Sequence, residues 1–534
     1  MKQVSRILPA IRRRKAQAKN NRQLSRLAKK VNQVPTKAGE APVVFFNAST
    51  RLGGLSLNAG FSLVTSWALR LQGIPVVHFV CDAGMSRCVL GTRQDDPSYS
   101  PPCAACKAQS RINFSNAQVR RFRFHPDNSL ENAIKSLALA ELENFSFQGM
   151  PLGRLVMPSL RWILRRHHLV DDEPTRYLCQ QYMLSAWNIT QKFQAFLEQV
   201  SPRCLVIFNG QFFPEATVRY ICLERGIRVI SHEVGLMPFS GFFTDGEATA
   251  YPIDIPVDFT LDDRQNARLD AYLSNRFQGH FSMAGVQFWP EIRNLSPEFT
   301  QRAAGFKQVV PVFTNVVFDT SQGHANTLYG NLFEWLDDVL QVIRANPETL
   351  FVIRAHPDEL RQGKESRESV AGWASANSIT DLPNVIFINS TDYISSYELI
   401  QLSKFVMVYN STIGLEASIL GKPVLCAGKA RFTQINSVFF PESRAKFLET
   451  LDQFLYAEEI QAPEEHRLNG RKFLYYQLYC TSLPFDAFLE DDRAWRGYVR
   501  VKQTPLSALT PETSETIRVI LDGIIKGQPF LLQP

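Results

Sequence analysis

The alternation of strands and helices is clearest in residues 405–427, which read Phe405-Val-Met-Val-Tyr-Asn-Ser-Thr-Ile-Gly-Leu-Glu-Ala-Ser-Ile-Leu-Gly-Lys-Pro-Val-Leu-Cys-Ala427. Two apolar runs, 405–409 and 423–427, flank a segment with helical spacing that ends at Gly421. Nearly continuous apolar strands between amphipathic helices indicate a parallel sheet covered on both faces. The pattern extends upstream, with strands expected at 309–317, 350–355 and 385–388 and helices at 328–344, 366–376 and 395–402.

A second block of the same kind lies nearer the N-terminus. Strands are expected at 43–46, 74–81, 204–209 and 227–232, with helices at 55–71 and 214–225. We therefore predict an α/β protein with two doubly wound, Rossmann-like domains that face a cleft. The predicted parts are a basic helical arm at 1–40, an acceptor domain at 41–295, a donor domain at 300–490 and a C-terminal tail with a helix at 491–534.

Composition narrows the class of protein. The chain has 534 residues, of which 45% are hydrophobic and 20% charged. No apolar run approaches the ~18 residues of a membrane-spanning helix. The first residues are basic and are not followed by the apolar stretch of a secretory signal, so we expect a cytoplasmic protein.

Charge is unevenly distributed along the chain. Residues 1–40 carry twelve Lys and Arg residues against one acid, whereas the rest of the chain has a net charge of −4. An acidic body argues against nucleic acid as a partner. Apolar residues at Ile7, Ile11, Leu24, Leu27 and Val31 predict a basic amphipathic helix. We interpret it either as a solvated arm, dispensable for folding, or as a foothold on the anionic inner face of the plasma membrane.

The nine cysteines are clustered in one place. Cys81, Cys88, Cys103 and Cys106 fall within 26 residues. The odd total argues against a disulfide framework. Four thiolates can hold a structural zinc ion, although the six-residue spacing of the first pair is long for such a site. The alternatives are an iron–sulfur cluster or ordinary thiols.

Polar side chains follow three expected strands of the second block. They are Asn315 near the end of the first, Arg354 and His356 around the end of the second, and Ser411 and Thr412 after the fourth, with Glu416 one helical turn further on. Ligands of doubly wound sheets bind at these strand ends. Hydroxyls and cationic groups suit a diphosphate, and a carboxylate suits ribose hydroxyls, which together describe a nucleotide-sugar site. Helix capping by Ser411 and Thr412 is the structural alternative.

Three strings carry a family resemblance. Phe313-Thr-Asn-Val-Val-Phe-Asp319, Ile353-Arg-Ala-His-Pro357 and Tyr409-Asn-Ser-Thr-Ile-Gly-Leu-Glu-Ala-Ser-Ile-Leu-Gly-Lys-Pro-Val424 resemble the capsule polysaccharide biosynthesis proteins, which are bacterial glycosyltransferases of the GT-B fold. The resemblance covers roughly residues 305–430. It implies that Ser411, Thr412 and Glu416 contact the phosphate and ribose of a donor, with Arg354 and His356 near the diphosphate.

In the first block no family motif is present, and candidate catalytic residues come only from residue type and position. His232 and Glu233, at the end of an expected strand, and Asp82, after another, are suited to act as general base on an acceptor hydroxyl. Gly53 and Gly54 between a strand and a helix would let backbone N–H groups approach an anion, although a tight turn needs them anyway.

The resulting functional prediction is a glycosyltransferase. It would move a sugar from a nucleotide-sugar donor to a polysaccharide or glycolipid acceptor at the cell surface, with no cofactor and no metal required for transfer. A nucleotide-sugar epimerase of the same fold and a non-catalytic scaffold of the assembly machinery are the alternatives.

Overall fold

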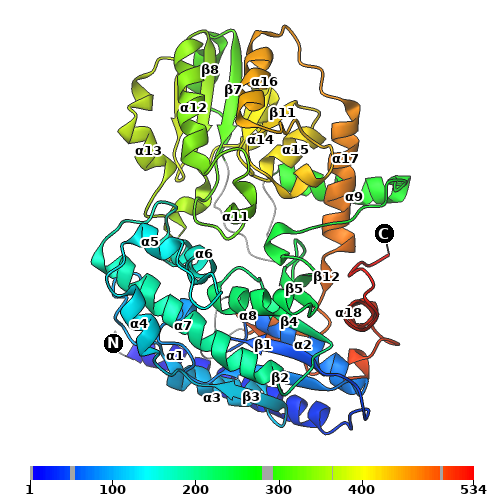
Figure 1. Cartoon of the computed structure of the whole chain (residues 1–534). Coiled ribbons are helices and arrows are strands. Elements are labelled where there is room, and N and C mark those ends of the chain that lie inside the picture. Colours follow the sequence, from blue (N-terminus) through cyan, green and yellow to red (C-terminus); the bar gives the residue numbers. More distant parts are fainter. Residues whose placement is uncertain are drawn as a thin grey trace. The chain divides into compact units, whose positions relative to one another are not determined.

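The computed structural model describes residues 4–48, 54–278, 293–361, 363, 365–492 and 497–533, with side chains from residue 11 onward. The chain forms two compact units (Figure 1). Unit 1 consists of Met1–Ile163, Val170–Tyr251 and Leu478–Pro534, and unit 2 of Leu164–Leu169 and Pro252–Gln477. Each unit is an α/β structure on its own sheet, wholly parallel in unit 2 and mainly parallel in unit 1, which confirms the predicted fold class of two Rossmann-like domains.

Unit 1 is built on a seven-stranded sheet with the order β12-β6-β5-β4-β1-β2-β3. Strands β1 to β5 run parallel, and β6 and β12 extend the sheet antiparallel at one edge. The strands are β1 Val43–Asn47, β2 Val76–Cys81, β3 Gln118–Phe122, β4 Cys204–Phe208, β5 Val229–Val234, β6 Ser240–Thr244 and β12 Leu483–Pro484. A separate antiparallel pair consists of β13 Leu489–Asp491 and β14 Val499–Val501.

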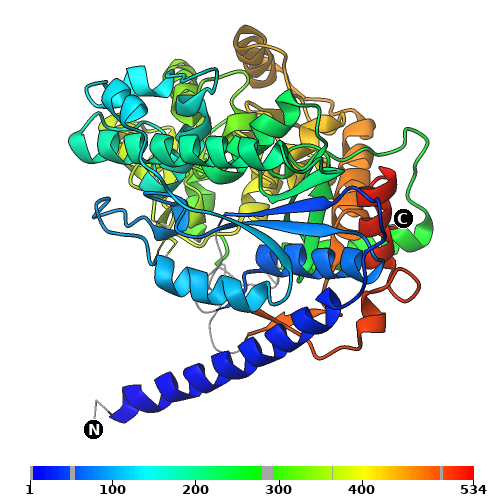
Figure 2. The same cartoon turned by 60° about the horizontal axis from the view of Figure 1, so that its bottom comes forward.

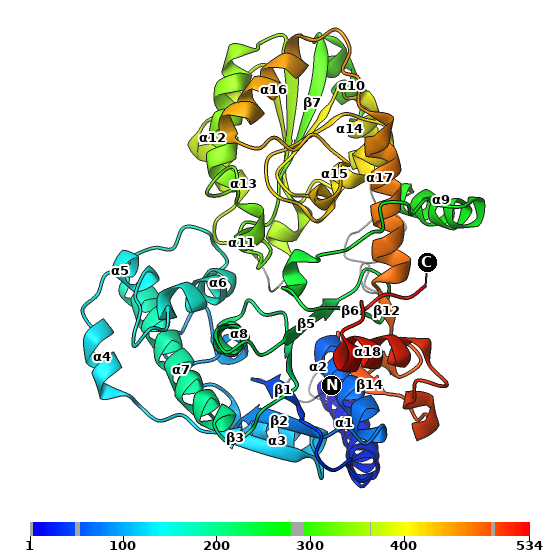
Figure 3. The ribbon, with the colours of Figure 1, turned by 45° about the vertical axis from the view of Figure 1, so that its right-hand side comes forward.

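Helices cover both faces of this sheet (Figure 3). Alternate side chains of β1 point to opposite faces of the sheet. Val43 and Phe45 belong to the core beneath α1, α2 and α18, whereas Phe46 packs against aromatic rings on the face covered by α7. The helices of unit 1 are α1 Val4–Asn32, α2 Leu57–Leu71, α3 Cys103–Asn113, α4 Asn128–Ile134, α5 Leu139–Glu143, α6 Leu152–Leu164, α7 Glu173–Leu197, α8 Phe213–Glu224 and α18 Glu515–Lys526.

Unit 2 repeats the same topology with five parallel strands in the order β11-β10-β7-β8-β9. The strands are β7 Gln308–Phe313, β8 Thr349–Arg354, β9 Val385–Ile388, β10 Val406–Val408 and β11 Val424–Cys426. The helices are α9 Asp263–Phe277, α10 Pro297–Ala304, α11 Gln322–Ala325, α12 Leu332–Ala345, α13 Val370–Ala376, α14 Ser396–Leu402, α15 Ile413–Ile419, α16 Arg444–Tyr456 and α17 Glu464–Tyr475.

The strand order fixes where each unit can bind a ligand. In unit 2, β7 lies between β8 and β10, and the connections leaving β7 and β10 lead in opposite directions along the sheet, to β8 and to β11. Right-handed crossovers then place the two connections on opposite faces. The same reversal occurs in unit 1 between β1 and β4. A crevice outside the carboxyl ends of the strands is expected at each such point.

The units do not coincide with the ranges expected from sequence. Residues 252–278 belong to unit 2, where Asp270 on α9 pairs with Arg471 on α17 at 2.8 Å. Residues 478–490 return to unit 1, because Leu483 of β12 pairs with Gly241 of β6. The C-terminal helix α18 packs against α2 in the core of unit 1. Pairings between segments far apart in the sequence have no local signature, so sequence patterns missed these exchanges.

The expectation that residues 1–40 form an arm dispensable for folding is wrong for the second half of α1. It is one long helix whose second half lies along unit 1 (Figure 2). Leu24, Ala28 and Val31 are 5%, 0% and 0% exposed and belong to the unit 1 core, whereas Ile11 is 43% exposed. Only the first half of the helix fits the description of an arm. No helix in the described ranges is both long and apolar enough to cross a membrane.

Replacing Leu24 with Ala should therefore destabilise unit 1. Truncating a buried leucine removes its burial energy and leaves a cavity, which costs about 2–5 kcal/mol of unfolding free energy. Urea unfolding followed by circular dichroism measures the loss. The control is Arg22→Ala on the same helix, whose exposed side chain should change stability by about 0.5 kcal/mol or less. Equal stability of both variants would show that α1 is an arm after all.

Candidate functional site

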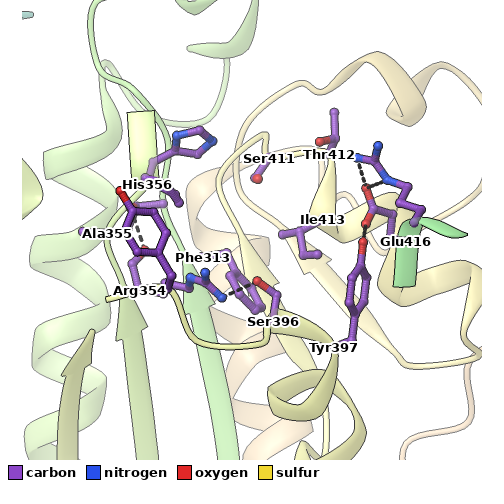
Figure 4. A pocket seen from close by; sticks show the side chains of 14 residues that line it. Phe313, Arg354, Ala355, His356, Ser396, Tyr397, Ser411, Thr412, Ile413 and Glu416 are labelled. Atoms are coloured by element: carbon purple, nitrogen blue, oxygen red, sulfur yellow. Dashed lines mark hydrogen bonds and ion pairs between the residues drawn. The ribbon is translucent and has the colours of Figure 1, made fainter. Parts of the chain in front are cut away.

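A pocket opens at the carboxyl ends of β7, β8 and β10, where the topology of unit 2 places a ligand (Figure 4). It encloses about 100 Å³, a fraction of the ~300–1,000 Å³ typical of a whole ligand site. A pocket of this size, formed by the described residues, has room for only one end of a ligand. The lining residues are Arg276, Phe313, Thr314, Arg354, Ala355, His356, Pro357, Tyr393, Ser396, Tyr397, Ser411, Thr412, Ile413 and Glu416.

Arg354 brings a buried positive charge to this pocket. It is the last residue of β8 and is 8% exposed. Its guanidinium donates a hydrogen bond to the Ser396 hydroxyl, and no carboxylate in the described ranges forms an ion pair with it. Burial lowers the pKa of Arg354 to about 10, which means that the site disfavours the charge as it stands. An anion in the pocket would remove that penalty.

His356 is oriented by the turn that follows β8. Its Nδ1 accepts a hydrogen bond from the Asp358 N–H at 3.2 Å, so the neutral ring carries its proton on Nε2. Burial is the main reason why the pKa of His356 is lowered. Glu359 holds the same turn in place by accepting hydrogen bonds from the Val370 N–H and the Ser390 hydroxyl, and burial raises the pKa of Glu359 to about 7.

Ser411 and Thr412 face the other side of the pocket, between β10 and α15 (Figure 4). Thr412 occupies the N-cap position of α15, yet its side chain makes no capping hydrogen bond. Neither hydroxyl is hydrogen-bonded within the part of the chain that the structure describes. Helix capping therefore does not explain these two residues, and both hydroxyls are available to a ligand.

Glu416 lies in the pocket wall with its carboxylate already paired. Arg276 of α9 donates two hydrogen bonds to its Oε1, at 2.8 and 2.6 Å, and the Tyr397 hydroxyl donates to its Oε2. Glu416 is 4% exposed, so this pairing offsets the cost of burying its charge. A ribose would have to share the carboxylate with Arg276 and Tyr397.

Sequence reasoning missed Arg276 and Tyr397. Arg276 lies 140 residues before Glu416, near the end of an amphipathic helix where an arginine is unremarkable. Asn315, by contrast, was a candidate but is not part of the pocket lining. The strand ends at Phe313, and the Asn315 side chain accepts a hydrogen bond from the Asn410 N–H at 3.2 Å, which ties the loop after β7 to the loop after β10.

The charges in this pocket add up to an anion site. Arg276 and Glu416 compensate each other, and Arg354 remains without a carboxylate partner in the described ranges. A charged donor, an imidazole N–H and two hydroxyls are the groups that bind phosphate oxygens. The pocket is thus chemically suited to a phosphate.

Unit 1 carries a second polar cluster at its own strand ends. Glu233, the next-to-last residue of β5, accepts hydrogen bonds from the side-chain amides of Asn58 on Oε1 and Asn209 on Oε2, both at 3.0 Å. Asn209 directly follows β4 and has a φ of +59°, a left-handed conformation that is strained for a residue with a side chain. Sequence analysis named Glu233 but neither asparagine.

The other unit 1 candidates are less suited to their predicted roles. His232 is 1% exposed, its Nδ1 is hydrogen-bonded to Asn58 at 3.1 Å, and burial lowers its pKa to about 3. Asp82 is held by Arg123 at 2.9 Å and Lys107 at 3.6 Å, and its pKa is lowered. Gly54 packs where a Cβ would meet the Tyr498 ring at 2.8 Å, and Gly53 lies outside the described residues.

Comparisons with known proteins agree with the motifs. Residues 291–435 match the model of the capsule polysaccharide biosynthesis protein family. The protein FixF of Sinorhizobium fredii is 28% identical over 229 residues, which are 42% of this chain. The match spans 48% of the length of FixF, so about half of FixF lies outside the matched region.

Similarity to solved structures is more distant. KpsC of Thermosulfurimonas dismutans, a beta Kdo 2,7 transferase, is 14% identical with a TM-score of 0.32, and the match covers 55% of this chain and 81% of KpsC. A UDP-GlcNAc 2-epimerase of Neisseria meningitidis is 12% identical with a TM-score of 0.22, covering 82% and 99%. Such values do not separate a transferase from an epimerase. The match to the capsule polysaccharide biosynthesis family is confined to residues 291–435, which contain every lining residue of the unit 2 pocket except Arg276, and it agrees with the resemblance carried by the sequence motifs.

Proposed function

We propose that the protein is a glycosyltransferase of capsule or surface polysaccharide synthesis, with a nucleotide-sugar donor whose phosphates bind in the unit 2 pocket. The observation that carries this proposal is Arg354, a buried guanidinium that lines a pocket and lacks a carboxylate partner in the described ranges. An apolar or cationic ligand would leave that charge uncompensated. The family of residues 291–435 supports a role in capsule synthesis.

In the proposed reaction, the oxygen of an acceptor hydroxyl attacks the anomeric carbon of the donor sugar. The bond between that carbon and the phosphate oxygen breaks, and its electron pair leaves with the nucleotide. Arg354, the Nε2–H of His356 and the hydroxyls of Ser411 and Thr412 donate to the phosphate oxygens as their charge grows. These side chains stabilise the negative charge that develops on the leaving group. We therefore propose that transfer needs no metal ion.

Glu233 is the group that we propose as general base. Its carboxylate takes the proton of the acceptor hydroxyl, and the amides of Asn58 and Asn209 hold it in place. His232, which is enclosed and bonded to Asn58, then orients the asparagine rather than touching a substrate. The acceptor, a polysaccharide or a glycolipid, is accordingly assigned to unit 1.

Arg354→Ala should weaken binding of the nucleotide sugar by about 10- to 100-fold, because a hydrogen bond to a charged group contributes about 1.5–3 kcal/mol. A panel of nucleotide sugars is first screened by thermal stabilisation of the wild-type chain, and the best ligand is then titrated calorimetrically. Arg354→Lys keeps the charge and should lose less affinity. The control is Arg444→Ala, which removes an exposed arginine of unit 2 that pairs with Asp338.

An assay with the same nucleotide sugar distinguishes transfer from epimerisation. A transferase releases its nucleotide only when a glycan acceptor is present, whereas an epimerase converts its nucleotide sugar alone. Formation of an epimer without an acceptor would refute the assignment as a transferase but would leave the proposed phosphate site in unit 2 intact. Unchanged affinity in Arg354→Ala would refute the pocket itself.

Glu233→Gln should reduce turnover by about 10²- to 10⁴-fold, the usual contribution of a general base. Donor affinity should stay unchanged, because the donor is assigned to unit 2. Steady-state release of the nucleotide at saturating donor measures turnover. Glu224→Gln, an exposed neighbour at the end of α8, serves as the control. If Glu233→Gln turned over at the wild-type rate, Glu233 would not be the general base.

We further propose that α1 holds the protein on an anionic membrane surface. Four exposed bases of its second half line a hollow of about 550 Å³ on unit 1, and five more are exposed on its first half. Each base near an anionic surface contributes about 1 kcal/mol. The four are Arg22, Arg26, Lys29 and Lys30, and the five are Arg12, Arg13, Arg14, Lys15 and Lys19.

Changing the four bases of the hollow to Gln should weaken binding to phosphatidylserine vesicles strongly, by up to about 10³-fold at low salt, without unfolding unit 1. Vesicle sedimentation at two salt concentrations measures it, with phosphatidylcholine vesicles as the uncharged reference. A control variant loses the same charge from four exposed bases on other helices and should bind as the wild type does. Equal binding by both variants would refute the proposal. The control bases are Lys446, Arg467, Arg518 and Lys526.

A further inference from the structure

The four clustered cysteines differ from the other five. Cys81, Cys88, Cys103 and Cys106 are each partly exposed, whereas the remaining cysteines are fully buried as small apolar residues are. The buried five are Cys179, Cys204, Cys222, Cys426 and Cys480. Neither the core of unit 1 nor the proposed transfer reaction accounts for the partly exposed quartet.

Three elements of unit 1 bring the quartet together. Cys81 ends β2, Cys88 precedes a short 3₁₀ turn, and Cys103 and Cys106 lie in the first turn of α3. An ion pair of 3.6 Å between Asp82 and Lys107 joins the neighbours of Cys81 and Cys106. Pro101 packs on Gly91, where an added Cβ would lie 2.7 Å from the proline and 3.0 Å from the Cys88 sulfur. The connection between β2 and α3 is thereby folded back on itself.

One of the sulfurs already accepts a backbone hydrogen bond. The sequence repeats a Cys-x-x-Gly spacing at Cys81 to Gly84 and at Cys88 to Gly91. The Gly84 N–H donates to the Cys81 sulfur at 3.2 Å, whereas the Gly91 N–H donates to the carbonyl oxygen of Cys88 at 3.0 Å. Ala83, inside the first turn, has a φ of +58°, a strained conformation for alanine. The Gly84 N–H therefore offsets part of the cost of forming a buried thiolate at Cys81, and the thiolate is the form of the side chain that binds metals.

The thiols lie near enough to affect one another's ionisation. The neighbouring thiols of Cys88, Cys103 and Cys106 help to raise the pKa of Cys81, and those of Cys103 and Cys106 help to raise the pKa of Cys88. Burial is the main reason why the pKa of Cys81 and that of Cys88 are raised to about 12, so both thiols are protonated at neutral pH. Burial also raises the pKa of Cys103, and the ammonium group of Lys107 opposes that rise. The same ammonium group would offset part of the negative charge of a four-thiolate centre.

We propose that Cys81, Cys88, Cys103 and Cys106 bind one zinc ion, which fixes the connection between β2 and α3 to the edge of the unit 1 sheet. A tetrahedral site of four thiolates at about 2.3 Å from the metal is a standard structural zinc centre. In the described ranges no three Cys, His, Asp or Glu side chains are already grouped so as to hold a metal ion. Zinc binding therefore requires the four thiols to move toward one another. Binding replaces four S–H protons by one Zn²⁺ and releases those protons to solvent.

The proposal predicts a metal content and its dependence on two residues. The full chain, purified without added metal, should contain about one zinc ion by elemental analysis. Cys103→Ser/Cys106→Ser should lose most of it, whereas Cys222→Ala, which changes a buried cysteine of the same unit, should keep it. A zinc chelator should lower the melting temperature of the wild type and of Cys222→Ala, but not that of the double variant.

A second measurement does not require the variant to fold. Wild-type chain stripped of metal and titrated with Co²⁺ should develop thiolate-to-cobalt absorption that saturates at about one ion per chain. Absence of that absorption would overturn the proposal. So would iron in place of zinc, a Cys103–Cys106 disulfide in the protein as purified, or a double variant that keeps its zinc. Each readout is independent of glycosyl transfer, so failure of the proposed function would leave this test intact.

Discussion

A parallel sheet covered on both faces leaves almost no room for polar chemistry along its strands. In unit 2 the side chains of β7, β8 and β10 are buried nearly throughout, and the hydrogen bonds of the backbone are used within the sheet. Polar side chains can face a ligand only where the strands end. Because β7 and β10 are neighbours whose connections diverge, their ends leave a crevice, and the chain places Arg354, His356, Ser411 and Thr412 around it. The unit 1 cluster around Glu233 follows from the same constraint at β4 and β5.

Charge compensation divides the unit 2 pocket into two parts. Glu416 is satisfied by Arg276 and Tyr397, which fixes α9 against α15 and gives this wall a stable shape. Arg354 has only a hydroxyl for a partner among the described residues, and burial opposes its charge. A buried ion pair is already balanced, whereas a buried cation without a carboxylate stores a driving force for binding an anion. The difference between these two arginines, more than the presence of any motif, gives the pocket its chemical preference.

The two units also differ in how their polar groups are held. In unit 2 the His356 ring is held by a backbone contact within its own turn, the bond from the Asp358 N–H, whereas Arg354 and Glu416 are held by other side chains. In unit 1 the carboxylate of Glu233 is anchored by two asparagine side chains, one of them on a residue in a strained conformation. A strained backbone conformation of this kind persists only where surrounding contacts hold it in place. Here the strained residue is Asn209, and its side chain positions the carboxylate of Glu233. The zinc centre that we propose would stabilise another strained turn, at Ala83, on the far side of β1 in the sheet order.

The sequence by itself determined the class of fold and most of the anion pocket. Apolar runs of strand length alternating with amphipathic helices allow only a covered parallel sheet, and residues that follow such strands must meet at one edge. Arg354, His356, Ser411 and Thr412 could therefore be grouped from their positions along the chain alone. Only the tertiary structure decided which long-range partners complete each site. Arg276 on Glu416, Asn58 on Glu233, Leu24 in the core and residues 478–490 in unit 1 all depend on packing between distant segments. Such pairings are selected by shape and burial in the folded chain, and neither quantity leaves a periodic signal in the residues around each partner.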